Sequence, residues 1–331
     1  MNRVRSLCAS MLLDVRATTF RAVEGWLTTL PLGLDLLKLR RTFDTRALAA
    51  AFPFANAEIE GRSGVLFGRN ATTGGLVFID RFGLDNYNQV VLARSGAGKS
   101  YFTKLQILRQ LYDGIEVLVI DPENEYTRLA RAVGGTEITL GANGARLNPL
   151  DLAAAGQPEA ITEQTLFMHS LVASLLGELS VEERSVLDHA VLRAYAGQGI
   201  TADPRTHARQ APLLHHVVAQ LDQQGTATRI ADGLRTYATG SYRGLFDEPT
   251  SVRPEGHLVV FSLRDLPAEL KAAGAVMAME SIWRRVTRGE RRRRVVVVDE
   301  AWLLLRAGGE AGAQFMWRLA KSARKYWCGL T

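Results

Sequence analysis

A short Gly-rich loop at Ser95–Ser100 has the residue types and spacing of a phosphate-binding loop. Its two glycines allow backbone N–H groups to turn inward around phosphate oxygens, and the helix expected after it would point its positive N-terminus at the same place. Lys99 supplies a charge for the β- and γ-phosphates, and the Ser100 hydroxyl is a ligand for Mg²⁺. Ala93 stands where the full pattern has its first glycine, and we expect the loop to tolerate it because it lies at the strand exit. The predicted nucleotide contacts here are Ser95, Gly96, Ala97, Gly98, Lys99, Ser100 and Tyr101.

A second set of chemical groups follows an apolar run far along the chain. The four valines at 295–298 predict a buried strand that ends at Asp299 and Glu300. Ligands of open α/β sheets collect at the carboxyl ends of strands, so Asp299 is the predicted Mg²⁺ ligand alongside Ser100. Glu300 is the predicted catalytic base for the attacking water. The Asp-Glu pair is a weak signal alone, but together with the catalytic Lys99 of a P-loop it indicates nucleotide hydrolysis.

Two further residues have candidate roles at this site. Asp121 ends a neighbouring predicted strand and is a candidate nucleotide contact, but its place before Pro122 equally fits a turn that caps the next helix. P-loop motors often complete their site with an arginine from the next subunit. Arg324, on the last predicted helix, is our first candidate for that catalytic arginine, and the alternative is simple surface charge.

Seven arginines lie within Arg284–Arg294. They could grip a phosphate backbone. Apart from Trp283, no aromatic residue is interleaved with them, and no base-reading motif is present. A solvated helix end and loop is therefore the favoured interpretation.

The elements that must position these residues form an α/β pattern. We expect an apolar strand at Gln89–Leu92, a helix at Lys99–Tyr112 and a fully apolar strand at Glu116–Ile120, which together make a strand–helix–strand unit. Two short β-like runs joined by turn residues at 69–75 predict a hairpin before this unit. Further strands are expected at 136–140, 257–263 and 294–298. The fold class we predict is α/β, with a parallel-rich sheet.

The strand signals vanish between residues 153 and 255, where helices are expected at 159–177, 180–196, 212–223 and 226–239. Ser180 and Glu183 form a capping box for the second helix. We therefore predict a helical insertion at 153–255 within a core made of 64–152 and 256–331, preceded by an N-terminal appendage at 1–63 that carries no identifiable chemistry. A final helix is expected at 310–325, and residues 326–331 predict the opening of another strand. On this basis we expect the chain to be a fragment.

The composition of the chain sets wider limits. Of its 331 residues 47% are hydrophobic, which suits a globular core, and the formal net charge of +6 is compatible with a polyanionic partner without indicating one. The two cysteines and six histidines show neither zinc-ligand spacing nor a disulfide framework, so nucleotide-bound Mg²⁺ is the one metal expected. The sequence has no secretory signal and no run of about 18 apolar residues, which predicts a cytoplasmic location.

Five motifs together resemble a known family. NYNQVVLARSGAGKSY, VLVIDPENEY, LNPLDL, GSYRGLFD and VVVVDEAWLLL, in this order, are similar to the large ATPase of type IV secretion and conjugative transfer systems, the VirB-four/TraC/TrbE class within the HerA–FtsK group of ring motors. The resemblance covers residues 25–331. It implies a RecA-like P-loop core that uses ATP and Mg²⁺, homo-oligomers that are commonly hexamers, other type IV secretion components as partners, and peripheral association with the inner face of the membrane. The family places a Thr-Gln sensor where this chain has Thr331.

Three functions remain in view from the sequence. The leading hypothesis is an ATPase that energises assembly of, or substrate transfer through, a conjugation apparatus. The second is a DNA-pumping ring motor of the HerA/FtsK type, for which DNA would be a partner. The third is a nucleotide-gated interaction protein without turnover, against which Glu300 argues because such a scaffold needs no base.

Overall fold

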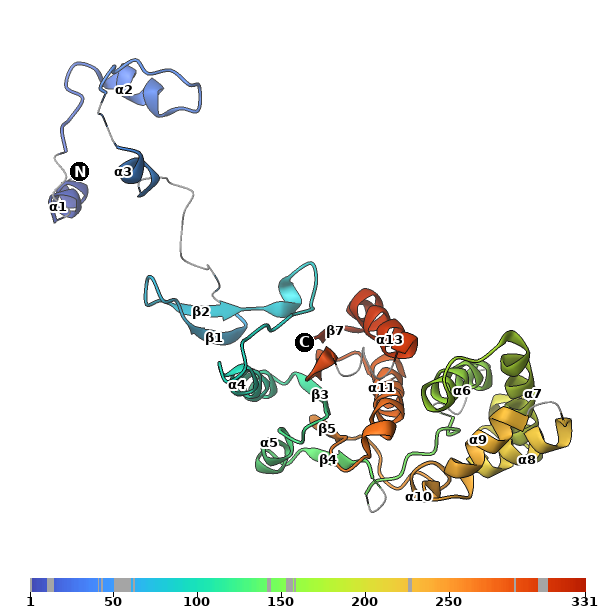
Figure 1. The fold of residues 1–331 in the computed structure, drawn as a ribbon. Helices are drawn as coiled ribbons and strands as arrows, with labels where there is room; N and C mark the ends of the chain where they lie inside the picture. The colour runs from blue at the N-terminus through green and yellow to red at the C-terminus, as the bar shows by residue number, and fades with distance from the viewer. Residues whose placement is uncertain are drawn as a thin grey trace. The chain divides into compact units, whose positions relative to one another are not determined.

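The computed structural model describes residues 2–10, 15–40, 42, 44–50, 61, 63–141, 144–152, 157, 159–225, 228–288, 290–302 and 309–331. The chain divides into two compact units, Met1–Ala57 and Glu58–Thr331. The first unit contains three short helices, α1 (Asn2–Ser10), α2 (Ala22–Thr29) and α3 (Thr45–Ala50) (Figure 1). None of the side chains described in this unit is buried, so the described part has no apolar core.

The second unit is built around a five-stranded parallel sheet with the order β4-β5-β3-β6-β7. The β-branched, apolar composition of the three inner strands suits strands that are covered on both faces. In β3, β5 and β6 every residue is buried. The predicted α/β fold class with a parallel sheet is therefore confirmed. The strands are β3 (Glu116–Asp121), β4 (Thr136–Thr139), β5 (Leu258–Ser262), β6 (Arg294–Val298) and β7 (Cys328–Leu330).

Helices cover both faces of this sheet (Figure 1). Successive side chains of a strand point to opposite faces. Val117 and Val119 accordingly belong to an apolar cluster that includes Ile107 of α4 (Lys99–Tyr112) and Ala130 of α5 (Thr127–Ala132). The alternating residues of β3 join a second, larger cluster on the opposite face. That face is covered by α11 (Lys271–Arg288) and α13 (Gly309–Ser322).

The segment that leads into the Gly-rich loop is not a strand, contrary to the prediction for Gln89–Leu92. Val90 and Leu92 are 81% and 89% exposed, and the segment runs beside β7 with one backbone hydrogen bond, from Gln89 N to Leu330 O at 2.8 Å. The apolar pattern alone favoured a strand. Leu330 N donates to the Asn88 side chain Oδ1 at 2.9 Å, so a side chain takes the place of a backbone acceptor beside β7.

The predicted hairpin is confirmed. The strands β1 (Val65–Arg69) and β2 (Leu76–Ile79) pair antiparallel, and the Asn70 carboxamide oxygen accepts from Thr72 N at 2.9 Å within the turn. A short 3₁₀ turn, η1 (Arg81–Gly83), follows directly.

Helices fill the chain between β4 and β5 (Figure 1). The capping box at the start of the second helix is present: the Ser180 hydroxyl accepts from Glu183 N, and Glu183 Oε2 accepts from Ser180 N. Buried side chains of these helices and of the α11 face of the sheet form one continuous apolar cluster. The division of the chain at 63, 152 and 255 remains a prediction. The helices are α6 (Ala160–Leu176), α7 (Val181–Gly197), α8 (Leu214–Gln224), α9 (Thr228–Ala238) and α10 (Arg243–Phe246).

In the described ranges of the chain, no helix combines the length and the apolar character that crossing a membrane requires.

Candidate nucleotide-binding site

The Gly-rich loop is an exposed turn that runs straight into α4. Gly96 and Gly98 adopt φ angles of 76° and 94°, and a Cβ on either would meet nothing within 4 Å. The glycines are therefore needed for the left-handed backbone and not for space. The helix begins at Lys99, and its first turn has N–H groups that the helix itself does not use. These donors directly follow the loop that the sequence assigns to phosphate.

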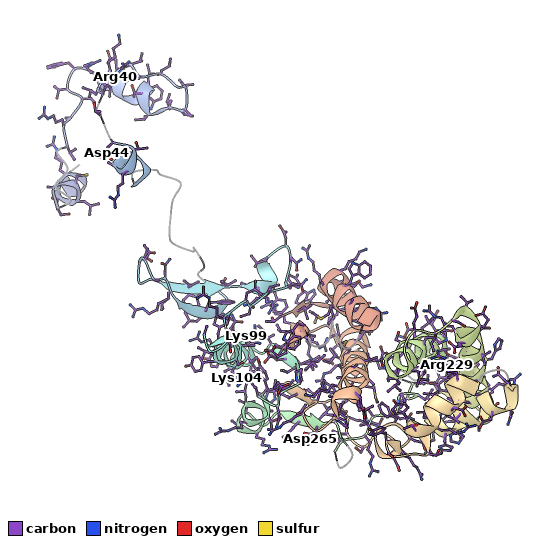
Figure 2. All side chains as sticks on the ribbon, viewed as in Figure 1. Arg40, Asp44, Lys99, Lys104, Arg229 and Asp265 are labelled. Carbon is purple, nitrogen blue, oxygen red and sulfur yellow. The ribbon has the colours of Figure 1, made fainter. Side chains whose placement is uncertain are left out.

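The structure brings together Lys99, Asp299 and Glu300, which the sequence predicted as partners in one site. Lys99 Nζ donates to Asp299 Oδ1 at 2.8 Å and also to Glu300 Oε1. Figure 2 marks Lys99 on α4 beside the sheet. Partial burial works against the charged amine, but the hydrogen bonds to both carboxylates outweigh it and raise the pKa of Lys99. A positively charged group is thus already held between the two acids.

The Glu300 side chain is fixed by its own backbone and by a neighbouring aromatic residue. Its φ of 49° is left-handed, which is uncommon for a residue with a side chain, and its N–H donates to Asp299 Oδ1 at 3.0 Å. The indole Nε1 of Trp302 donates to Glu300 Oε2. Hydrogen bonds first from Lys99 and then from Trp302 lower the pKa of Glu300. The carboxylate is therefore ionised and able to accept a proton at neutral pH.

Asp121 lies at the end of β3, next to the strand that carries Asp299. It is fully buried, and its two carboxylate oxygens accept backbone N–H groups of Glu125 at 3.0 Å and Tyr126 at 2.8 Å. Burial raises the pKa of Asp121 despite these bonds. Holding the turn after β3 was the alternative left open by the sequence, and these contacts favour it. A contact of Asp121 with nucleotide stays a prediction.

Tyr126 is a residue near the site that the sequence did not single out. Its ring is buried, and its hydroxyl lies near the Asp299 carboxylate without a hydrogen-bond partner among the described residues. Burial and the nearby Asp299 carboxylate raise the pKa of Tyr126. Its place at the end of DPENEY was the available signal, but a tyrosine there is equally typical of a core position.

Arg324 lies apart from these carboxylates in the described contacts. Arg324 is exposed on the 3₁₀ turn η4 (Ala323–Tyr326), and its guanidinium lies 5.8 Å from the ring centre of Tyr87. This position on the surface leaves both the trans-acting role and simple surface charge open, so its catalytic role remains a prediction.

The arginines at 284–294 fall into two groups. Arg291, Arg292 and Arg293 are exposed, as the favoured solvated loop requires, whereas Arg284, Arg285 and Arg294 bond to acceptors within the chain. Arg285 Nε donates to Glu116 Oε1 at 2.5 Å, and the buried Arg294 donates to the other oxygen of the same carboxylate at 3.2 Å. Arg284 bonds Glu280 at 2.9 Å. These three guanidinium groups are occupied by internal acceptors, so they are poorly placed to grip a nucleic-acid backbone. The sequence could not reveal this because Glu116 lies far away in the chain.

The donors and acceptors of the loop suit a nucleoside triphosphate and a divalent cation. Ser100 is half-buried in the first turn of α4, and Tyr101 beside it is 73% exposed. The carboxylates that hold the Lys99 ammonium are oxygen ligands of the kind that Mg²⁺ prefers. The ion pair of Lys99 with Asp299 and Glu300 supports this assignment, because the two carboxylates already bind a cationic group.

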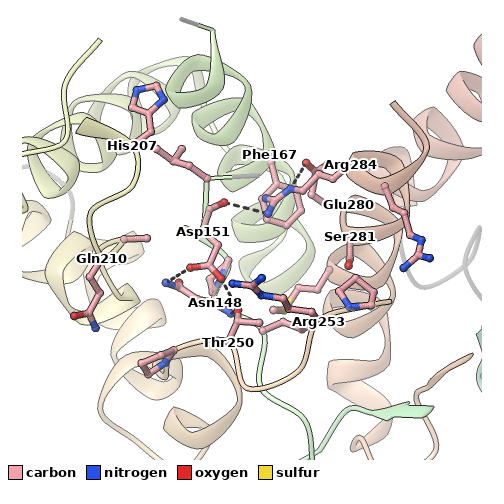
Figure 3. Close-up of a pocket in the computed structure, with 18 of the residues that line it drawn as sticks. Asn148, Asp151, Phe167, His207, Gln210, Thr250, Arg253, Glu280, Ser281 and Arg284 are labelled. Atoms are coloured by element: carbon pink, nitrogen blue, oxygen red, sulfur yellow. Dashed lines mark hydrogen bonds and ion pairs between the residues drawn. The ribbon is translucent and has the colours of Figure 1, made fainter. Parts of the chain in front are cut away.

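A cavity of about 750 Å³ lies elsewhere, where the loops at 147–152 and 249–255 meet α6 and α11 (Figure 3). Asp151 organises its wall: its backbone oxygen accepts from Arg284, and its carboxylate accepts from Asn148 and Thr250. Neither the Gly-rich loop nor the Asp299–Glu300 pair contributes to this cavity. It is separate from the candidate nucleotide site.

A parallel sheet whose Gly-rich loop leads into a helix, with an Asp-Glu pair at the carboxyl end of a buried strand, defines a P-loop ATPase fold of the RecA-like kind. Residues 89–200 match the family model described as "Helicase HerA, central domain". The chain is similar to VirB4 of Thermoanaerobacter pseudethanolicus, with 28% identity and a TM-score of 0.74 over 82% of this chain and 76% of that one. The resemblance to the VirB4/TraC/TrbE class is thus confirmed.

Other solved structures match more distantly. The conjugative coupling protein TrwB in an unbound form has 14% identity and a TM-score of 0.46, over 72% of this chain and 60% of that one. TrwB in complex with ADP and Mg²⁺ has the same identity and TM-score, over 71% and 61% of the two chains. No curated protein sequence matches the chain.

Proposed function

We propose that the chain is the ATP-hydrolysing motor part of a type IV secretion or conjugative transfer apparatus. The observation that carries the proposal is the contact of Lys99, at the end of the P-loop, with both Asp299 and Glu300. The similarity to VirB4 over most of both chains supports the choice among P-loop ATPases. The energy released would drive assembly of the apparatus or translocation of its substrate.

The loop and α4 bind the substrate in this proposal. Backbone N–H groups of 95–101 hold the phosphates, and the helix N-terminus favours their negative charge. Ser100 and Asp299 would hold Mg²⁺, which when bound neutralises charge on the β- and γ-phosphates. Lys99 leaves its carboxylate partners and turns to the γ-phosphate.

Glu300 accepts the proton of the attacking water. Its pKa is lowered while Lys99 donates to it, so it is a weaker base in that arrangement. When Lys99 turns to phosphate, Glu300 loses the larger of the two hydrogen bonds that lower its pKa and becomes a stronger base. Substrate binding by Lys99 and activation of Glu300 are therefore coupled through one ion pair.

The working unit we propose is a homo-oligomer, commonly a hexamer in the VirB4/TraC/TrbE class. The exposed position of Arg324 on η4 is compatible with a contact to the nucleotide of a neighbouring subunit. The partners would be other secretion components at the inner face of the membrane, with the motor in the cytoplasm and associated peripherally. DNA is a further candidate partner.

The test is release of inorganic phosphate from ATP together with binding of a fluorescent ATP analogue. Lys99→Ala is expected to lower turnover by about 10²-fold or more, because it removes a charge that acts on the transferring phosphoryl group. Lys104→Ala is the matched control, since Lys104 lies on the same helix and pairs with Glu125 at 3.2 Å outside the site. Unchanged turnover in Lys99→Ala would contradict the proposal. Tight analogue binding without phosphate release from the unaltered chain would favour a nucleotide-gated interaction protein.

A second function is favoured by the match to the HerA central domain. A DNA-translocating ring motor should show hydrolysis that DNA stimulates and that salt suppresses steeply. A secretion motor whose cargo is protein should not. Measuring phosphate release with and without DNA at two salt concentrations distinguishes the two functions.

A further inference from the structure

Arg81 is a buried arginine that joins three segments of the chain. It begins η1, directly after the hairpin, and is 7% exposed. Its Nε donates to the backbone oxygen of Tyr87, in the segment that enters the Gly-rich loop. Its Nη1 donates to the Thr331 hydroxyl at 2.7 Å, and its Nη2 donates to Leu330 O at 2.5 Å. One side chain thus connects η1, the loop's entry segment and β7.

The charge of Arg81 is not balanced in the usual way. Within the described ranges, no carboxylate forms an ion pair with it. Burial lowers the pKa of Arg81 to about 10, opposed by the nearby Cys328 thiol. A buried cation without an acid partner costs free energy unless its N–H donors are satisfied. Here backbone oxygens and a hydroxyl satisfy them, so the side chain is committed to holding these segments.

The entry segment has further polar attachments. Asn88 supplies two of them: its Nδ2 donates to Ala320 O, and its Oδ1 accepts from Leu330 N, both at 2.9 Å. The approach to β7 is close, because a Cβ on Gly329 would lie 2.3 Å from Tyr87 O. Side chains therefore replace most of the ladder that a regular strand would have formed before the loop.

On its other edge, β7 pairs with β6, the strand that precedes Asp299 and Glu300. Thr331 N donates to Val296 O, and Val298 N donates to Thr331 O, both at 2.8 Å. Val298 directly precedes Asp299 on β6. Arg81 therefore contacts both the segment that ends in Lys99 and the strand that lies against the Asp299 strand.

We propose that Arg81 is a positioning residue for the nucleotide site: it sets the entry segment of the P-loop against β7 and thereby fixes Lys99 relative to Asp299 and Glu300. Arg81 itself touches none of the reacting groups. The proposal rests on the proposed function where turnover is measured, but its structural part is independent of hydrolysis.

The buried Cys328 beside Arg81 provides a reporter. Burial raises the pKa of Cys328 to about 12, so its thiol should react slowly in the native chain. In the full chain with Cys8→Ser, Cys328 is the one remaining thiol. Adding Arg81→Gln is expected to increase the rate of its labelling by an aromatic disulfide reagent by about tenfold, because hydrogen bonds of a charged group are lost. The affinity for a fluorescent ATP analogue and kcat should fall, and Arg81→Lys should restore them in part.

Two further variants make the test decisive. Arg109→Gln is the matched control, because Arg109 Nη1 donates to Leu66 O and Phe67 O of the same hairpin without contacting β7. It should leave Cys328 labelling and nucleotide affinity unchanged. Asn88→Ala removes the hydrogen bonds of Asn88 to Ala320 and Leu330. It should change Cys328 labelling and nucleotide affinity in the same direction as Arg81→Gln. This second variant keeps the proposal testable if Arg81→Gln does not fold.

Three results would overturn the proposal. One is unchanged labelling and affinity in both Arg81→Gln and Asn88→Ala. Another is an equal change in Arg109→Gln. The third is faster labelling with full nucleotide affinity, which would make Arg81 purely structural. If Lys99→Ala shows that the chain does not hydrolyse ATP, the labelling and affinity measurements still decide the role of Arg81.

Discussion

Lys99 Nζ lies 2.8 Å from Asp299 Oδ1, although the two residues are 200 positions apart in the chain. The contact joins the start of α4 to the end of β6, and Glu300 shares it. Each partner in this group can be removed separately, and the consequences should differ.

Asp299→Asn and Glu300→Gln should separate binding from chemistry. Asp299→Asn is expected to weaken the part of ATP affinity that depends on Mg²⁺, because an amide oxygen is a poorer ligand than a carboxylate. Glu300→Gln should keep that affinity and lower kcat by about 10²-fold or more through loss of the base. Titrations of an ATP analogue with Mg²⁺ and with EDTA, alongside phosphate release, measure both. Identical losses in the two variants would contradict the separate roles.

Trp302→Phe should change the pH dependence of turnover. The indole hydrogen bond helps to lower the pKa of Glu300, so its removal raises that pKa. Because the base must be ionised, the acid limb of the kcat profile is expected to move to higher pH. Trp317→Phe, at an exposed position of α13, is the control and should leave the limb in place. A profile of Trp302→Phe that matches the unaltered chain would rule out this role.

Gly329→Ala should disturb the entry to the loop. The added Cβ would lie 2.3 Å from Tyr87 O, so the segment must move, at a cost of about 1–3 kcal/mol in the free energy of unfolding. Gly197→Ala is a control at the end of α7, where a Cβ meets nothing within 4 Å; there alanine should stabilise by up to about 1 kcal/mol. Urea unfolding of both variants tests the difference. Equal effects on the free energy of unfolding would contradict a close packing of Gly329 against Tyr87.

Arg229→Gln should affect the helical segment at low pH. Arg229 donates to both oxygens of Glu183 and, together with Ser180 N, lowers the pKa of Glu183 to about 2. The stabilisation from a lowered carboxyl pKa is present above the ordinary value of 4.5 and is lost as pH falls toward 2. Arg229→Gln should raise the pKa of Glu183, which NMR titration of the carboxyl carbon would record. The stability of the variant should therefore fall less between pH 4.5 and pH 2. Arg205→Gln, whose partner is Asp203, should not shift the pKa of Glu183.

Local patterns predicted most of the elements and the two halves of the site. The helix at Lys99–Tyr112 and the buried valines before Asp299 follow from periodicity, and the fold class follows from their order. Gln89–Leu92 was predicted wrongly because pairing depends on the partner strand, which composition does not reveal. Arg81 was missed because nothing around it in the sequence points to Leu330, 249 residues away. Side-chain contacts of this range are set by packing and leave no local pattern.

The ammonium of Lys99 is a built-in counterion for two adjacent acids. Like charges on Asp299 and Glu300 would repel each other across the end of β6, and an internal cation removes that repulsion without any metal. The arrangement of Lys99, Asp299 and Glu300 should therefore form before the substrate binds. A chelator should accordingly leave the melting temperature of the chain unchanged. When nucleotide draws Lys99 away, it must bring replacement positive charge with it, so metal-free ATP should be a poor ligand.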